Sequence, residues 1–193
     1  SSPNRIIWCY VRSAQSLLAD IASMEANEAQ QDKIVLLVLL CVNIVEAFTN
    51  IYFVVKARES GDASLVECID KGLGIDSDRG IGIKAKLDRW PPKVLGKSVN
   101  WSSGYGKEFE SLRKTRNRLM HFTSAHEGHE VDNIQISGLS DTSVYDELDA
   151  RIANKAFDTV IGFIEHILLK SGTKKEDIPA ALHVWLGLIA SQR

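Results

Sequence analysis

The sequence has few cysteines, and they are spread too widely to form a disulfide framework. Among 193 residues there are three, Cys9, Cys41 and Cys68, and no two of them make a Cys-x-x-Cys pair. Disulfide-dependent secreted proteins carry an even set, whereas isolated thiols are typical of the reducing cytoplasm. We therefore expect a cytoplasmic protein in which Cys9 and Cys41, both within apolar helical patterns, lie in the core.

The chain also lacks an excess of charge of either sign. Its 23 Lys and Arg residues face 25 Asp and Glu residues, so the net charge is −2. A uniformly basic surface is thereby excluded, and binding to nucleic acid must come from a local patch. A chain of this length can bury roughly two thirds of its unfolded surface, and we expect one helical domain spanning residues 1–193.

No apolar stretch is free of polar interruptions over the length of a membrane span. Residues 34–42 are all apolar and the apolar character continues to Val55, but Asn43, Glu46, Thr49 and Asn50 interrupt it. A charged or amide group in the middle of a bilayer is costly. We therefore expect no membrane partner, and interpret the segment as the central buried helix of a bundle whose polar residues face a site.

Apolar residues recur with helical spacing along most of the chain. This periodicity predicts helices over about 4–27, 31–57, 106–124, 143–170 and 175–191, with one short extended piece at 131–136. Ser143 and Asp146 resemble a capping box at the start of the fourth helix. No ladder of strands is indicated, so the fold class is all-α, a helical bundle.

Residues 60–106 differ in composition from the rest. They hold most of the glycines and two of the four prolines, Pro91 and Pro92. Two Gly-x-Gly runs occur there, but neither follows a strand or completes a phosphate-binding fingerprint. We expect an irregular insert between the second and third long helices, with short helices near 63–71 and 83–90. Its second half is basic, with Lys84, Lys86, Arg89, Lys93 and Lys97 against Asp88.

The third helix carries the most chemistry. Between Ser111 and Arg118 it has four positive charges and no negative one: Arg113, Lys114, Arg116 and Arg118. Asn117 and His121 are four residues apart and share a helix face, so the amide could orient the imidazole. Arg116 and His121 are five apart, about 140° around a helix, and two facing copies would assemble them more easily. The spacing predicts a composite site in a homodimer.

Arg116-Asn117-Arg118-Leu119-Met120-His121 resembles the signature of the HEPN superfamily, an Arg followed by four to six residues and a His. The stretches Glu46–Asn50 and Lys86–Pro91 are also similar to segments of HEPN-like proteins. The resemblance covers residues 31–170, and only the motif is specific. It implies a four-to-five-helix bundle, usually a homodimer, and many members are metal-independent endoribonucleases, with no metal or cofactor.

The resemblance assigns roles to the motif residues. His121 would be the acid or base near neutral pH, Arg116 would hold the phosphate and stabilise developing charge, and Asn117 would position either group. RNA phosphates would also contact Arg113, Lys114 and Arg118. Glu46 or Asn43 would supply an additional polar group.

Other interpretations of these residues remain open. The arginines could form a solvated helix face paired with Glu110, and His121 could be structural. A non-catalytic HEPN-like module would bind RNA, a nucleotide or a protein, such as an antitoxin or another component of a larger system. The superfamily is rich in toxins and phage-defence proteins. A third alternative is a zinc site at His121, His126 and His129, although their spacing matches no zinc signature.

Overall fold

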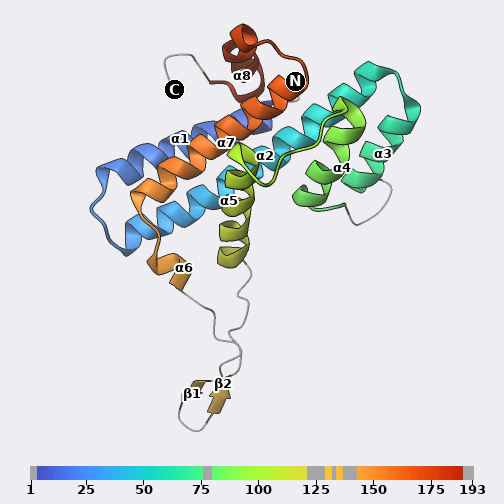
Figure 1. Cartoon of the computed structure of the whole chain (residues 1–193). Coiled ribbons are helices and arrows are strands. Elements are labelled where there is room, and N and C mark those ends of the chain that lie inside the picture. Colours follow the sequence, from blue (N-terminus) through green and yellow to red (C-terminus); the bar gives the residue numbers. More distant parts are fainter. Residues whose placement is uncertain (1–3, 76–79, 121–128, 132–133, 137–142, 189–193) are drawn as a thin grey trace.

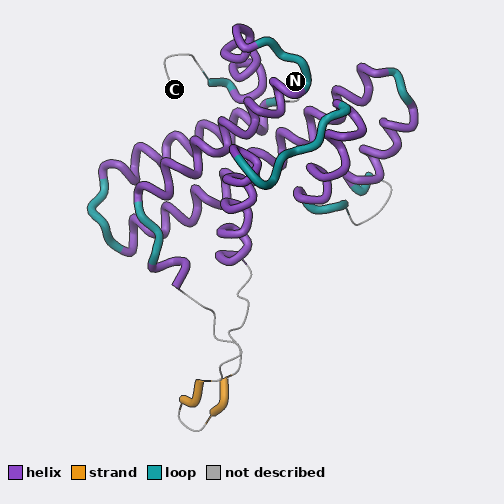
Figure 2. Tube along the Cα trace, in the orientation of Figure 1, coloured by secondary structure: helices purple, strands orange, loops and turns teal. Residues whose placement is uncertain are grey.

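The computed structural model describes residues 4–75, 80–120, 129–131, 134–136 and 143–188. These residues form eight α-helices, one 3₁₀ helix and a two-stranded hairpin (Figures 1 and 2). The predicted all-α class is confirmed. The four long helices expected from the periodicity are α1 (Arg5–Ser23), α2 (Glu28–Ser60), α5 (Gly104–Met120) and α7 (Ala150–Lys170).

Helix α2 is the centre of the bundle. It is the longest helix and packs against α1, α7, α5 and both helices of the insert (Figure 1). Its N-terminus is capped by Asn27, whose side chain accepts a hydrogen bond from the backbone of Gln30, and it ends at Gly61 with a left-handed backbone. Buried residues cover a broad face of α2, whereas Leu36 and Asn43 on the opposite side are exposed, so the helix is less completely buried than its continuous apolar sequence predicted.

Helix α5 is fixed against α7 by a pair of aromatic rings. Phe109 of α5 and Phe163 of α7 are both fully buried, and their rings stack with centroids 4.6 Å apart. Burial of a side chain of this size contributes roughly 1.5–3 kcal/mol. The contact holds one face of α5 against the core, and α5 also packs against α2 and α6.

The insert is more helical than the sequence predicted, and both of the expected short helices are present and longer than expected. Two helices, α3 (Ala63–Leu73) and α4 (Ile83–Leu95), occupy it, and both pack against α2. Helix α4 continues through Pro91 and Pro92, although each proline lacks the N–H that would donate a helical hydrogen bond and its ring crowds the carbonyl four residues earlier. Trp90, fully buried against Phe53 of α2, holds the helix in place across this weak point.

The end of the chain is more interrupted than its periodicity suggested. The predicted fourth helix is divided into α6 (Ser143–Asp146) and α7, and Asp149 caps α7 by accepting hydrogen bonds from the backbone of Arg151 and Ile152. The predicted last helix begins as a 3₁₀ turn (Lys175–Asp177) and α8 (Ile178–Leu186) stops before Gly187, whose φ is positive. The expected extended piece is a hairpin of β1 (His129–Val131) and β2 (Ile134–Ile136).

One of the two cysteines expected in the core lies on the surface. Cys41 is buried, and burial raises the pKa of its thiol to about 12. Cys9 is exposed because it falls two residues after Ile7 and two before Val11, on the face of α1 opposite these core residues.

Helix α2 is the one helix of the described residues that is long and apolar enough to cross a membrane. Half of its most apolar stretch is buried within the chain. The buried core helix of a bundle has the same length and composition, so this property is weak support for a membrane span.

Candidate functional site

A pocket of about 610 Å³ lies where α2, α4 and α5 meet. Its size is within the range of small-ligand sites. We call it the interhelical pocket; it is lined by one residue of α2, the first turns of α4 and three motif-region residues of α5, namely Glu46, Gly82, Ile83, Lys84, Ala85, Asp88, Arg113, Arg116 and Asn117. The structure therefore brings four of the predicted site residues together, and the insert forms one wall.

Most charges at the interhelical pocket are paired with one another. Lys84 contacts Asp88 at 2.7 Å, one turn apart on α4. Nε and Nη2 of Arg113 donate to the two carboxylate oxygens of Glu110, each at 2.9 Å. This hydrogen bond holds the pKa of Glu110 below its usual range. The ion pair with Glu110 is the structural role that the sequence left open for Arg113.

A buried lysine, Lys86, lies outside the pocket lining but contacts Glu46, which lines the pocket. Lys86 of α4 is 5% exposed, and its Nζ donates to Oδ1 of Asn50 at 2.8 Å. Oε1 of Glu46 lies 3.4 Å from the same nitrogen, and the ammonium is 5.6 Å from the ring centroid of Trp90. Lysine is rarely buried unless its charge is satisfied in this way. The contacts fasten the insert to α2 and neutralise Glu46.

Arg116 is bound differently from the other cations of the pocket. Its Nη1 donates to Oδ1 of Asn117 at 3.0 Å, and the side chain is half-buried. Within residues 4–75 and 80–120, no carboxylate lies in salt-bridge contact with it. Since Lys84 and Arg113 each have a carboxylate and Glu46 has Lys86, the net positive charge of the pocket lies on Arg116.

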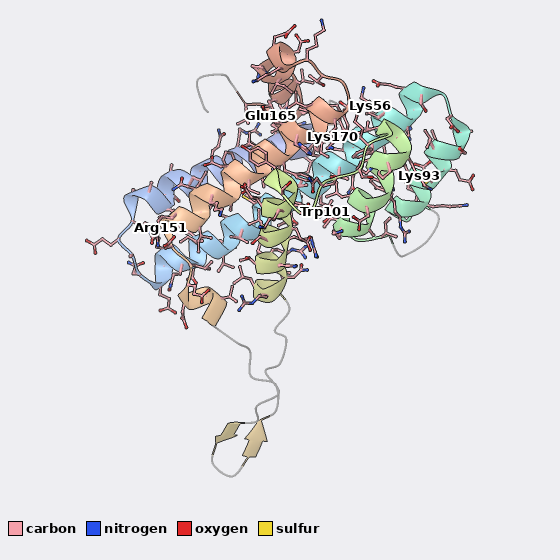
Figure 3. All side chains as sticks on the ribbon, viewed as in Figure 1. Lys56, Lys93, Trp101, Arg151, Glu165 and Lys170 are labelled. Atoms are coloured by element: carbon pink, nitrogen blue, oxygen red, sulfur yellow. The ribbon has the colours of Figure 1, made fainter. Side chains whose placement is uncertain are left out.

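Trp101, in the connection between α4 and α5, positions the wall made by α4 (Figure 3). Its Nε1 donates to Oδ1 of Asp88 at 2.8 Å, and Nζ of Lys84 lies 4.2 Å from its ring centroid. The ring stacks on Phe163 with centroids 6.3 Å apart. Trp101 and Trp90 are therefore engaged by the protein, in accord with a packing role for both.

The remaining predicted site residues are not at this pocket. Arg118 lines a different pocket of about 460 Å³ between α5, α6 and α7, because two residues beyond Arg116 is roughly 200° around the helix. Lys114 is exposed. Asn43 is also exposed and lies one turn before Glu46 on α2, outside the pocket lining.

The histidines of the motif and of the zinc alternative cannot be placed from the structure. His121 and His126 lie outside the described residues, and of His129 only the backbone is described. Among the side chains that the structure does describe, no group of three or more His, Cys, Asp or Glu residues has the arrangement of a metal site.

Three residues of the site were not singled out from the sequence: Lys86 as a partner of Glu46, Asn50 as its acceptor, and Lys84. Signals for them were present in the basic half of the insert and in the four-residue spacing of Lys84 and Asp88.

Comparison of the chain with protein-family models, with curated proteins and with solved structures gave no match.

Proposed function

We propose that this chain is a HEPN-like domain that binds RNA and cleaves it without a metal, at a site containing Arg116, Asn117 and His121. One observation carries the proposal: Arg116 is the cation of the interhelical pocket without a carboxylate partner among the described residues. A guanidinium in this situation is available to an anion from outside, and a phosphate matches its fork of donors.

The charges of the pocket favour binding of one phosphate group at Arg116 over a general attraction of anions. Asp88, Glu110 and Glu46 each face a cation, so they repel an anion less than isolated carboxylates would. Arg116 remains, beside the Asn117 amide group, which can donate through its nitrogen. This arrangement fits a single phosphate group, in agreement with the near-neutral charge of the whole chain.

The chemistry would be transesterification within RNA. His121, four residues beyond Asn117 in the sequence, takes the proton of the ribose 2′-OH, and the 2′ oxygen attacks the adjacent phosphorus. The bond to the 5′ oxygen breaks, that oxygen gains a proton, and the products are a 2′,3′-cyclic phosphate and a free 5′-OH. Arg116 stabilises the extra charge on the phosphate oxygens. No metal is required at any step.

The site would be completed in a homodimer. A helix places Arg116 and His121 about 140° apart, so one chain does not easily direct both at one phosphate. In a two-fold dimer each chain would offer Arg116 to the His121 of its partner. We place the protein in the cytoplasm, where RNA and a partner such as an antitoxin are accessible.

The experiment is an incubation of the purified chain with mixed RNA in EDTA, beside His121→Ala and Arg116→Ala. Arg12→Ala, an exposed arginine of α1, is the matched control. We expect cleavage by wild type and Arg12→Ala only, with 2′,3′-cyclic phosphate ends. Binding of RNA without cleavage by any variant, with helical circular dichroism intact, would identify a non-catalytic RNA-binding module instead.

A further inference from the structure

Glu46 is an unusual residue to find in a pocket that binds an anion. It lies on α2 and shares the interhelical pocket with Arg116 and Asn117, and its side chain is 32% exposed. A carboxylate beside a phosphate would normally weaken binding through repulsion of like charges. Its presence therefore needs either a compensating cation or a ligand group that favours a carboxylate, and the structure provides the first.

The compensating cation is Lys86, which does not itself line the pocket. Its ammonium is held from three sides, by Asn50, by Glu46 and by the face of Trp90. Burying a lysine is costly, and the cost is offset only while all these partners stay in place. The result is a carboxylate whose charge is neutralised from the protein side and whose position is fixed by two helices.

A carboxylate that stays ionised, with its charge paired by Lys86 and its position fixed, is suited to one kind of ligand group. An ionised carboxylate only accepts hydrogen bonds, so it recognises a donor. In RNA the 2′-OH is a donor adjacent to the phosphate, and this hydroxyl distinguishes RNA from DNA. The pocket presents a phosphate-binding cation and a hydroxyl-binding carboxylate together, which matches the ribose 2′-OH and its neighbouring phosphate.

We propose that Glu46, held and neutralised by Lys86, accepts a hydrogen bond from the ribose 2′-OH beside the phosphate bound by Arg116, and that this contact makes the site selective for RNA over DNA. The inference rests on the proposed function in that it takes RNA as the ligand. It does not require that the RNA be cleaved. Lys86 is here a positioning residue, and Glu46 a specificity-determining one.

The rival explanation is that Lys86 only fastens α4 to α2. Under that explanation, removing the ammonium would disturb the pocket for every ligand, and no second change at Glu46 would repair it. Under our proposal, removing Lys86 exposes an uncompensated negative charge at Glu46. Neutralising Glu46 as well would then restore binding.

The experiment measures binding by fluorescence anisotropy in a His121→Ala background, which prevents cleavage. The probes are one short single-stranded sequence as RNA, as DNA and as 2′-fluoro RNA, in which the hydroxyl donor is replaced by fluorine. We expect RNA to bind about ten-fold more tightly than either analogue, the effect of one hydrogen bond to a charged group. This comparison needs no variant of the pocket.

Four variants then test which residues cause the preference for RNA over DNA. Glu46→Ala should lower RNA binding to the level of DNA and leave DNA binding unchanged or stronger. Lys86→Met should weaken RNA and DNA alike, and Lys86→Met with Glu46→Gln, which keeps a neutral acceptor, should recover both the affinity and the RNA preference. The matched control is Lys56→Met, from the Lys56–Glu59 pair further along α2 (Figure 3), and it should behave as the background.

The outcomes separate this inference from the proposed function. Equal binding of RNA and 2′-fluoro RNA would overturn it, as would equal losses for RNA and DNA in Glu46→Ala or a double variant no better than Lys86→Met. A protein that binds RNA selectively but does not cleave it would overturn the cleavage proposal and support this one. A folded protein that binds neither RNA nor DNA would overturn both.

Discussion

Arg116 and Asn117, neighbours on α5, are joined by a hydrogen bond of 3.0 Å from the guanidinium Nη1 to the amide Oδ1. The sequence had paired Asn117 with His121, one turn further on. The amide oxygen of Asn117 accepts from Arg116, and its amide nitrogen can donate to a further group. Among the described residues the amide of Asn117 therefore orients the guanidinium of Arg116, the group proposed to bind phosphate.

A change at Asn117 that adds charge should be more harmful than one that only removes the amide. Asn117→Asp places a carboxylate beside Arg116 and neutralises the last uncompensated cation of the pocket. We expect RNA binding to fall by a few-fold to about ten-fold more than in Asn117→Ala, the range of an additional ion pair. Anisotropy titrations at low salt measure it. Equal losses in the two variants would mean that the charge of Arg116 does not bind RNA.

Mixing two inactive variants tests whether the site is shared between chains. Arg116→Ala and His121→Ala are each expected to be inactive. If Arg116 comes from one chain and His121 from its partner, each mixed dimer has one intact site, and random exchange should restore about a quarter of wild-type activity. The measurement is RNA cleavage after co-refolding of equal amounts. Mixtures as inactive as the separate variants, in a protein that sizing shows to be dimeric, would assign both residues to one chain.

The sequence predicted the long helices well because their signal is local. Ile7, Val11, Ala14 and Ile21 of α1 recur at helical spacing, and all four are buried. Cys9 was placed in the core because it lies within this apolar pattern, but its position in the pattern puts it on the opposite face. The short helix expected near 83–90 extends to Leu95 and includes Pro91 and Pro92, and the buried Trp90 directly precedes them.

The site could be predicted only in part, since its assembly depends on long-range packing. The cluster of Arg113, Arg116 and Asn117 is visible in the sequence. Arg118, however, lies on the other side of α5 from Arg116 and lines another pocket. Lys86 and Glu46 are 40 residues apart, and their contact exists only because α4 folds back onto α2. The sequence predicted a short helix near 83–90, but no local pattern encodes its return onto α2.

An added methyl group should be more costly at Gly106, in the first turn of α5, than at Gly162 of α7, which lies against Tyr105 of α5. A Cβ at Gly106 would lie 2.0 Å from the backbone oxygen of Asn100, which cannot rotate away, so we expect Gly106→Ala to lower the free energy of unfolding by about 1–3 kcal/mol. A Cβ at Gly162 would meet the ring of Tyr105, at 2.1 Å. That ring is 46% exposed and can move.

The matched variant Gly162→Ala is therefore expected to be the milder of the two. Alanine is favoured over glycine within a helix by about 1 kcal/mol, which offsets part of the cost of displacing Tyr105. Urea unfolding followed by circular dichroism compares the free energies of unfolding. A Gly106→Ala protein as stable as wild type would show that the segment around Asn100 yields easily and does not fix the first turn of α5.

Acid should weaken the protein partly through the Arg113–Glu110 pair. The hydrogen bond from Arg113 lowers the pKa of Glu110 in the folded state from its usual value of 4.5. A lowered folded-state pKa contributes stability that is fully present above the unfolded value and is lost as the pH falls through the folded one. We therefore expect this part of the free energy of unfolding to disappear below about pH 4.5, the ordinary glutamate range.

Two variants isolate that contribution from the other carboxylates. Glu110→Gln removes the titrating group and Arg113→Met removes the cause of the shift, so each should lose less stability than wild type between pH 7 and pH 3. Both should already be somewhat less stable at pH 7, because a half-buried bidentate pair has been broken. Urea unfolding at the two pH values gives the comparison. If both variants lost as much stability as wild type over that interval, this pair within α5 would have no part in acid unfolding.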